Sequence, residues 1–332
     1  MRNAIRRRLL LFVAAGLAAA GIAAGVAFAR SGATPIGTGV VVINTTLGYQ
    51  DGAAAGTGMV LTRSGEVLTN NHVIRGATTI RVVVPGTKYS YPATVVGYDV
   101  TDDVAVLKAV GASNLKTVTT STSKLALGQK VTAVGNANGT GRLASAHGAI
   151  TALRQSIVVS DDQGGTESLS GLIKTNANLR PGDSGGPLLN RAGKVIGMDT
   201  AASTGVVFSS ASSEGYAIPI AKAVSVSKQI ESGRASTRVH IGATAFLGIQ
   251  VQSVTSTGVL VAGVVPGGPA DSAGISAGDL ITAIDGNSIA SPSSLSTYLL
   301  TKKPGQTVTV TYMDQGGMSH SVSVTLASGP AQ

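Results

Sequence analysis

The segment Gly182–Leu188 reads Gly-Asp-Ser-Gly-Gly-Pro-Leu and places Ser184 inside a glycine-rich turn. Small neighbours permit a strained turn that exposes the serine hydroxyl and directs backbone N–H groups toward one point. Acyl transfer needs both features, a nucleophile and donors for the oxyanion. The turn alone is ambiguous, because Gly182-x-Ser184-x-Gly186 also satisfies the nucleophile elbow of α/β-hydrolases, and many Gly-Ser loops are simple turns.

Few side chains can act as the general base for such a serine. The chain contains four histidines, His72, His147, His240 and His320. His72 lies in Leu68–Ile74 (LTNNHVI), after a strand-like run, so we expect it at a strand end. Asp103 stands at the mouth of an apolar strand, where its carboxylate can be buried against an imidazole.

The order of these residues along the chain separates the alternatives. An α/β-hydrolase would need Ser184 followed by an acid and then His320, whereas a subtilisin would need an acid before His72. Both folds alternate strands with helices, a pattern that the first 200 residues do not show. The order His72, Asp103, Ser184 is that of the chymotrypsin-type double barrel.

The hydrophobic pattern also indicates a β-rich fold. Short β-branched runs are broken by Gly, Asn and Asp without helical periodicity, which predicts an antiparallel barrel or sandwich. An amphipathic helix over 220–232, ended by Gly233, is expected to close the first domain. Strands of this domain are expected at 40–46, 59–62, 79–84, 94–98, 104–108, 131–134, 157–160 and 194–199.

A second module follows a predicted linker at residues 233–243. It covers residues 244–332 and again combines short strands with one helix. Its strands are expected near 247–254, 258–264, 280–284, 307–313 and 320–326, and its helix near 293–302.

Composition excludes several classes of function. The chain has 332 residues, enough for about two domains, and no cysteine, which excludes disulfides, thiolate catalysis and cysteine zinc sites. Its net charge is +9, but five basic residues lie in the first 30, and the remainder carries 20 basic and 16 acidic side chains. No nucleic-acid partner is therefore expected. No metal-binding or phosphate-binding motif is found, so no cofactor and no metal are expected.

The N-terminus predicts export of the protein. Residues 9–29 are 21 residues without a charged or polar side chain, preceded by Arg6–Arg8. About 20 apolar residues can cross a bilayer, so residues 1–30 are predicted to be a basic stub and transmembrane anchor, followed by a linker at 31–39. The alternative is a signal peptide cleaved after Ala27-Phe28-Ala29. In both cases the basic end stays inside, which places the catalytic domain outside the cytoplasm, either anchored to the cell membrane or secreted.

Four motifs resemble those of the HtrA/Deg serine proteases, which combine a chymotrypsin fold with PDZ modules. They are Thr69–Ile74 (TNNHVI), Asp103–Lys108 (DVAVLK), Gly182–Leu188 (GDSGGPL) and Gly215–Pro219 (GYAIP). The resemblance covers residues 40–326. It implies a mainly β fold, with a chymotrypsin-like double β-barrel protease domain at 40–232 and a small α+β PDZ domain at 244–332.

The same resemblance implies the roles of the site residues. Ser184 would be the nucleophile, His72 the general base and then acid, and Asp103 the orienting carboxylate. The backbone N–H groups of Gly182 and Ser184 would form the oxyanion hole. Asp183 stands where family members often carry Asn, which changes the polarity of the loop more than the mechanism.

The resemblance also implies substrates and partners. Unfolded or damaged extracytoplasmic proteins would be the substrates, and the family forms trimers. The aromatic residues that support trimers in the family have no counterpart around residues 31–45. A non-proteolytic, PDZ-based holdase with a latent protease fold is the alternative function.

Two recognition sites are predicted. The position six before the nucleophile is Asn178, followed by Leu179, so the S1 pocket lacks the carboxylate that selects Lys or Arg and should favour small or medium aliphatic side chains. Phe246-Leu247-Gly248-Ile249 resembles the carboxylate-binding loop of PDZ domains, which binds peptide C-termini. Phe246 and Ile249 as ordinary core residues are the alternative for this loop.

Overall fold

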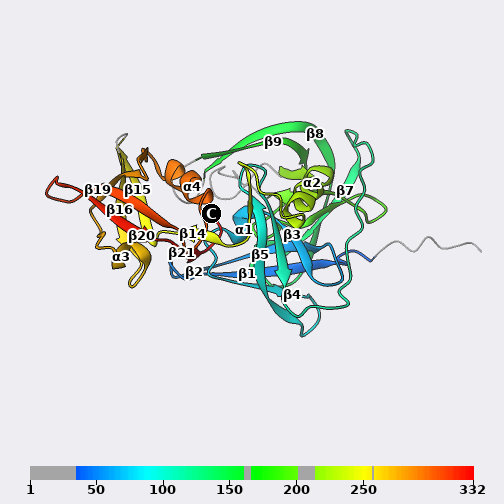
Figure 1. The fold of residues 1–332 in the computed structure, drawn as a ribbon. Helices are drawn as coiled ribbons and strands as arrows, with labels where there is room; N and C mark the ends of the chain where they lie inside the picture. Colours follow the sequence, from blue (N-terminus) through cyan, green and yellow to red (C-terminus); the bar gives the residue numbers. More distant parts are fainter. Residues whose placement is uncertain (1–34, 161–165, 201–213, 256–257) are drawn as a thin grey trace, which may run out of the picture. The chain divides into compact units, whose positions relative to one another are not determined.

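The computed structural model describes residues 35–160, 166–200, 214–255 and 258–332. Within these ranges the strands form two closed antiparallel barrels and then a smaller sheet with helices (Figure 1), which confirms the predicted β-rich architecture. The membrane anchor predicted at residues 9–29 lies outside the described residues. Among the residues that are described, no helix combines the length and apolar character needed to cross a bilayer.

The first barrel has six strands in the order β5-β4-β1-β2-β3-β6, and β5 also pairs with β6 to close it. Its interior is filled by β-branched and aromatic side chains such as Ile43, Val67 and Tyr98, all fully buried. A short helix, α1 (Asn71–Ile74), follows β3. The strands are β1 (Val40–Leu47), β2 (Gly52–Val60), β3 (Glu66–Thr69), β4 (Thr79–Val83), β5 (Ser90–Asp99) and β6 (Val104–Ala109).

The second barrel has the strand order β10-β11-β12-β9-β8-β7. Its core contains Ile150, Ile173 and Leu188. A 3-10 turn, η1 (Ala137–Gly139), lies between β7 and β8. The strands are β7 (Lys130–Gly135), β8 (Ala144–Ser160), β9 (Thr166–Thr175), β10 (Pro187–Leu189), β11 (Val195–Thr200) and β12 (Gly215–Pro219).

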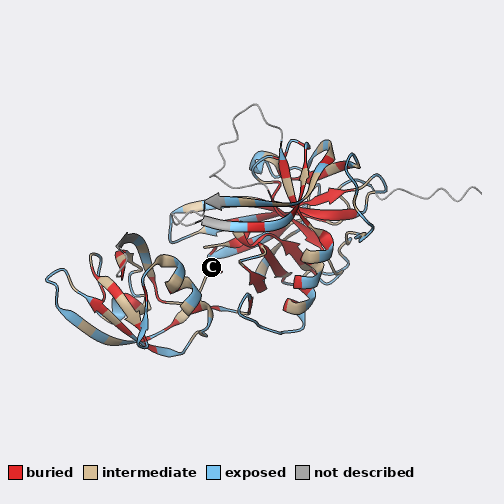
Figure 2. Cartoon of the chain, turned by 90° about the horizontal axis from the view of Figure 1, so that it is seen from above, coloured by how far each residue is buried: buried red, intermediate tan, exposed pale blue. Residues whose placement is uncertain are grey.

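The two barrels share a third hydrophobic cluster, covered by α2 (Ile220–Glu231). Met59 and Val106 from the first barrel meet Leu172 and Met198 from the second in this cluster. Figure 2 shows the buried residues concentrated along the strands. The helix expected over 220–232 is confirmed, and it buries one apolar face against both barrels.

The segment predicted to be a linker is partly ordered into the first barrel. Val239–Ile241 forms β13, which pairs antiparallel with Gly97–Asp99 at the end of β5. Only three residues take part, too few for a period-two pattern to be recognised in the sequence. The edge of the first barrel is therefore continued by residues that follow α2.

The C-terminal module is a sheet in the order β15-β16-β17-β19-β20 with its own apolar core. Its main helix, α4 (Pro292–Leu300), begins with a capping box in which Ser291 and Ser294 exchange hydrogen bonds. The strands are β14 (Thr244–Phe246), β15 (Ile249–Thr255), β16 (Gly258–Val264), β17 (Leu280–Ile284), β18 (Asn287–Ser288), β19 (Thr307–Met313), β20 (Ser319–Thr325) and β21 (Ala327–Gly329), and the second helix is α3 (Pro269–Ser272).

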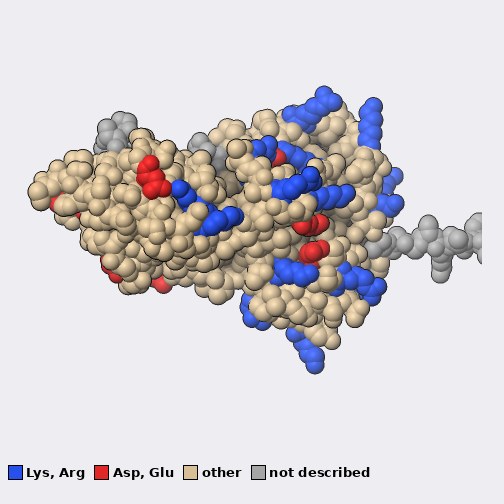
Figure 3. All heavy atoms as spheres, in the orientation of Figure 1, with Lys and Arg blue, Asp and Glu red and all other residues tan. Residues whose placement is uncertain are grey.

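Charged side chains are sparse on the displayed face. Figure 3 shows Lys and Arg in small separate groups over the barrels, with few Asp and Glu among them. A continuous basic stripe, the usual electrostatic footprint for nucleic acid, is not formed on this face of the described residues.

Candidate active site

His72 and Asp103 form a hydrogen-bonded pair within the first barrel. His72 Nδ1 lies 2.9 Å from Asp103 Oδ2 and 3.1 Å from Oδ1, and the His72 backbone N–H donates to Oδ1 at 3.0 Å. The Asp103 side chain is 4% exposed and that of His72 20%. The buried carboxylate therefore orients the imidazole through Nδ1, which leaves Nε2 as the nitrogen that can accept a proton.

Asp103 is presented by a tight turn between β5 and β6. Its φ is +52°, a left-handed conformation that an L residue adopts at some cost. Asn70 Nδ2 donates to the Asp103 carbonyl at 2.9 Å, and the Asp102 N–H donates to Asp99 Oδ1 at 2.9 Å. These bonds hold the turn, and with it the carboxylate, in place.

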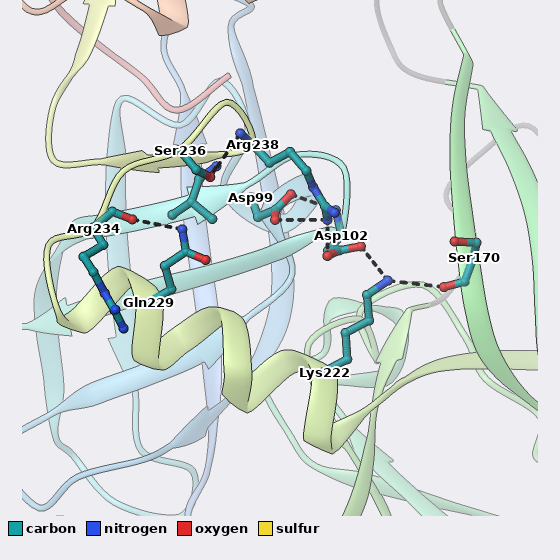
Figure 4. A network of polar contacts seen from close by, with 9 residues as sticks. Asp99, Asp102, Ser170, Lys222, Gln229, Arg234, Ser236 and Arg238 are labelled. Atoms are coloured by element: carbon teal, nitrogen blue, oxygen red, sulfur yellow. Dashed lines mark hydrogen bonds and ion pairs between the residues drawn. The ribbon is translucent and has the colours of Figure 1, made fainter.

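Two cations secure this turn from outside, as Figure 4 shows. Arg238, just before β13, binds Asp102 and lies 3.3 Å from Asp99 Oδ2. Lys222 in α2 reaches Asp102 Oδ1 at 2.5 Å and donates to the Ser170 carbonyl at 3.3 Å. Burial raises the pKa of Asp99, and Arg238 opposes that rise. We call these four residues, Asp99, Asp102, Lys222 and Arg238, the turn clamp.

The glycine-rich turn of Ser184 is packed against the first barrel. Gly182 and Gly185 have φ of +94° and +82°. A Cβ at Gly185 would lie 2.1 Å from the Thr57 carbonyl oxygen, and one at Gly182 would lie 2.2 Å from that of Asn136, so both positions require glycine. Thr57 in β2 donates from Oγ1 to the Gly182 carbonyl at 2.6 Å and from its N–H to the Ser184 carbonyl at 2.9 Å.

Further hydrogen bonds connect the serine turn with the His72–Asp103 pair. Thr69, at the end of β3 before His72, donates to the Thr57 carbonyl at 2.7 Å. Thr200, at the end of β11, donates from Oγ1 to Asp103 Oδ2 at 3.1 Å. The three residues predicted from the motifs thus belong to one hydrogen-bonded framework where the barrels meet. Sequence reasoning missed Thr57 and Thr200, because no local pattern marks a threonine whose partner comes from the other barrel.

Comparison with known proteins identifies the two domains and the family. Residues 56–198 match the trypsin-like peptidase domain, and residues 245–326 match the PDZ domain. The serine protease Do-like HtrA of Lactococcus lactis subsp. cremoris is 33% identical over 282 residues, which are 80% of this chain and 69% of that protein. The chain belongs to the HtrA family of serine proteases.

Two further proteins show similarity over most of this chain. Serine protease PepD of Mycobacterium tuberculosis is 34% identical over 303 residues, covering 86% of this chain, and the chain spans 63% of the length of PepD. A solved structure of the HtrA-type protease AlgW with tripeptide shares 28% identity and a TM-score of 0.50, over 88% of this chain and 94% of that chain.

The residues predicted for the S1 pocket of this HtrA chain lie just before the serine turn. Asn178 is exposed and Leu179 is buried. The Leu179 side chain packs on β12, where a Cβ at Gly215 would lie 2.6 Å from Leu179 Cδ1. Residues 201–213, between β11 and β12, lie outside the described residues, and the S1 assignment stays a prediction.

The loop predicted to bind peptide C-termini joins β14 to β15. Gly248 has a φ of +81°, and the carbonyls of Leu247 and Gly248 accept from Ala270 and Val265 at 3.0 and 2.9 Å. The N–H groups of Leu247 and Gly248 make no hydrogen bond to any other described residue. Leu247 is buried in the core, as the alternative interpretation of this loop expects for its apolar residues. β15 is an edge strand of the sheet, and α4 contacts it.

Proposed function

We propose that the chain is a serine endopeptidase in which Ser184 is the nucleophile, His72 the general base and then acid, and Asp103 the orienting carboxylate. The observation that supports this proposal most is the hydrogen-bonded His72–Asp103 pair. Its carboxylate is buried and accepts a further hydrogen bond from Thr200. A serine hydroxyl is a weak nucleophile until a base accepts its proton, and an imidazole is an effective base when its tautomer is held.

The mechanism has two halves. Ser184 Oγ attacks the peptide carbonyl carbon while its proton passes to His72 Nε2, and the N–H groups of Gly182 and Ser184 stabilise the oxyanion. The tetrahedral intermediate collapses, the C–N bond breaks, and His72 gives the proton to the leaving amine. Water then attacks the acyl-enzyme with His72 as base, which releases the acid and restores Ser184. Asp103 stabilises the imidazolium in both halves.

Unfolded or damaged extracytoplasmic proteins are the proposed substrates, cleaved after small or medium aliphatic residues. Support for this specificity comes from Asn178 and Leu179, which place no carboxylate near the expected S1 pocket. The location is supported by residues 9–29 and the arginines before them, as a membrane anchor or a cleaved signal peptide. A homo-oligomer remains a prediction from the family resemblance.

The C-terminal module is proposed to bind peptide C-termini and to regulate the protease. Unused N–H groups at Leu247 and Gly248 can receive a carboxylate, and the free edge of β15 can pair with an added strand. A holdase without proteolysis is the competing function. It gives no reason for the ordered hydrogen bonds around Asp103.

The test is hydrolysis of a permanently unfolded protein by the full chain and by Ser184→Ala. We expect Ser184→Ala to lower turnover by several orders of magnitude, as removal of a triad member does. Ser232→Ala, which alters an exposed serine at the end of α2, is the matched control and should keep the parental rate. Degradation by Ser184→Ala at the parental rate would show that the assigned nucleophile is wrong.

A further inference from the structure

A further buried carboxyl group lies next to the serine turn. Asp199 in β11 is fully buried, and neither of its carboxyl oxygens has a hydrogen-bond partner among the described residues. Its backbone is bonded to the turn on both sides, because its N–H donates to the Gly186 carbonyl at 2.7 Å and its carbonyl accepts from the Gly185 N–H at 2.8 Å. Asp199 is thus attached to the two glycines that follow Ser184.

The charge that acts on Asp199 belongs to Asp183, the residue before Ser184. Asp183 is also buried, and its Oδ2 accepts from the Arg180 N–H at 2.8 Å. Burial raises the pKa of both carboxyl groups, and the charge of Asp183 raises the pKa of Asp199 further. Two buried acidic residues are therefore attached to the turn of Ser184. Asp183 precedes Ser184 in the chain, and Asp199 is bonded through its backbone to Gly185 and Gly186.

The elements packed around Asp199 provide little positive charge that could stabilise an ionised carboxylate. Arg180 acts on Asp183, while β12, which pairs with β11 at Asp199, contributes Tyr216 and no charged residue. Helix α2 also packs on β11, but its Lys222 is bound to Asp102, and Lys228 and Glu231 are exposed. An ionised carboxylate without a partner is unfavourable in a protein interior, so Asp199 is expected to hold its proton at neutral pH.

We propose that Asp199 is a positioning residue, that it must be a neutral carboxylic acid for the turn to present Ser184, and that its ionisation limits activity at alkaline pH. This inference rests on the proposed protease function. Loss of the proton would place two like charges behind the turn. Gly185 is packed too closely against Thr57 to move alone. The two charges can therefore separate only if β11 and the turn move together.

The experiment measures the rate constant for labelling by a fluorophosphonate probe from pH 5 to pH 10, with the full chain and two variants. Each profile is normalised to its own maximum and corrected for probe hydrolysis without protein. The wild-type rate should fall by at least threefold between its maximum and pH 10. Asp199→Asn should lose this fall. Asp183→Asn should move it to lower pH, because the charge of Asp183 raises the pKa of Asp199 and is absent in this variant. An alkaline fall that is missing in the wild type, or unchanged in Asp199→Asn, overturns the proposal.

A second measurement does not depend on catalysis. The pKa of Asp199 is higher in the folded than in the unfolded chain, so the folded state keeps a proton that the unfolded state loses, and stability falls as pH rises above about 4. In a Ser184→Ala background, Asp199→Asn should therefore show a smaller decrease in Tm from pH 5 to pH 9. Equal slopes would overturn the inference about Asp199. A wild-type chain that never reacts with the probe would instead contradict the protease function, and with it the positioning role.

Discussion

Replacement of Thr200 by Val tests how strongly the second barrel supports the His72–Asp103 pair. Thr200 Oγ1 donates to Asp103 Oδ2 at 3.1 Å, and both residues are buried. Valine has nearly the same shape but no donor, so the buried carboxylate would keep only the bonds from His72. A hydrogen bond to a charged group contributes about 1.5–3 kcal/mol. About 1.4 kcal/mol corresponds to a factor of ten in rate, so Thr200→Val should lower the rate of hydrolysis by at most about 10- to 150-fold.

The loss should appear in kcat more than in KM, because the charge of Asp103 is needed most when the imidazolium forms. The assay is the initial rate of hydrolysis of a fluorogenic peptide at pH 7.5, with Tm measured in parallel. Thr200→Ser is the matched control, since it keeps the hydroxyl, and should stay within about threefold of the wild type. Wild-type activity in Thr200→Val, or equally slow hydrolysis by Thr200→Ser and Thr200→Val, would show that this hydrogen bond does not support the His72–Asp103 pair.

Other regions give further expected outcomes. Arg238→Gln should loosen the turn clamp and lower kcat several-fold, whereas Arg234→Gln, which alters an exposed arginine nearby, should leave kcat unchanged. Equal kcat values for the two variants would show that the turn clamp does not affect catalysis. Mapping of cleavage products should show small or medium aliphatic residues before the cut, and cleavage mainly after Lys or Arg would contradict the S1 assignment. Peptides with a hydrophobic C-terminus should bind the second module more tightly as free acids than as amides, and equal Kd values would leave residues 246–249 as ordinary core.

Strands and helices were predicted most accurately where turn residues mark the ends of an apolar run or of a helical pattern. The limits of β6, β17 and α2 were predicted almost to the residue, because Asp and Gly residues lie next to the two apolar runs and Gly233 follows the helix. β10 was missed because three residues cannot display a period. β13 was missed for the same reason, and it occupies what composition predicted to be a linker.

The candidate site shows a similar division. His72, Asp103 and Ser184 could be predicted from motifs and their order, because local sequence determines the tight turns that present them. Thr200 and Asp199 were not, since their significance depends on which elements pack against β11 after folding. No single-sequence pattern distinguishes a buried, unpartnered aspartate from an aspartate in an exposed turn.

The central claim is that Ser184 becomes covalently modified during catalysis, with His72 as its base. Its most direct test is mass spectrometry of the full chain after reaction with a fluorophosphonate, with digestion to locate the adduct. We expect one adduct per chain on the peptide that contains Ser184. Labelling should be at least a thousandfold slower in His72→Ala, because a triad member is lost. Labelling at another residue, or labelling of Ser184 at an undiminished rate without His72, would contradict this claim.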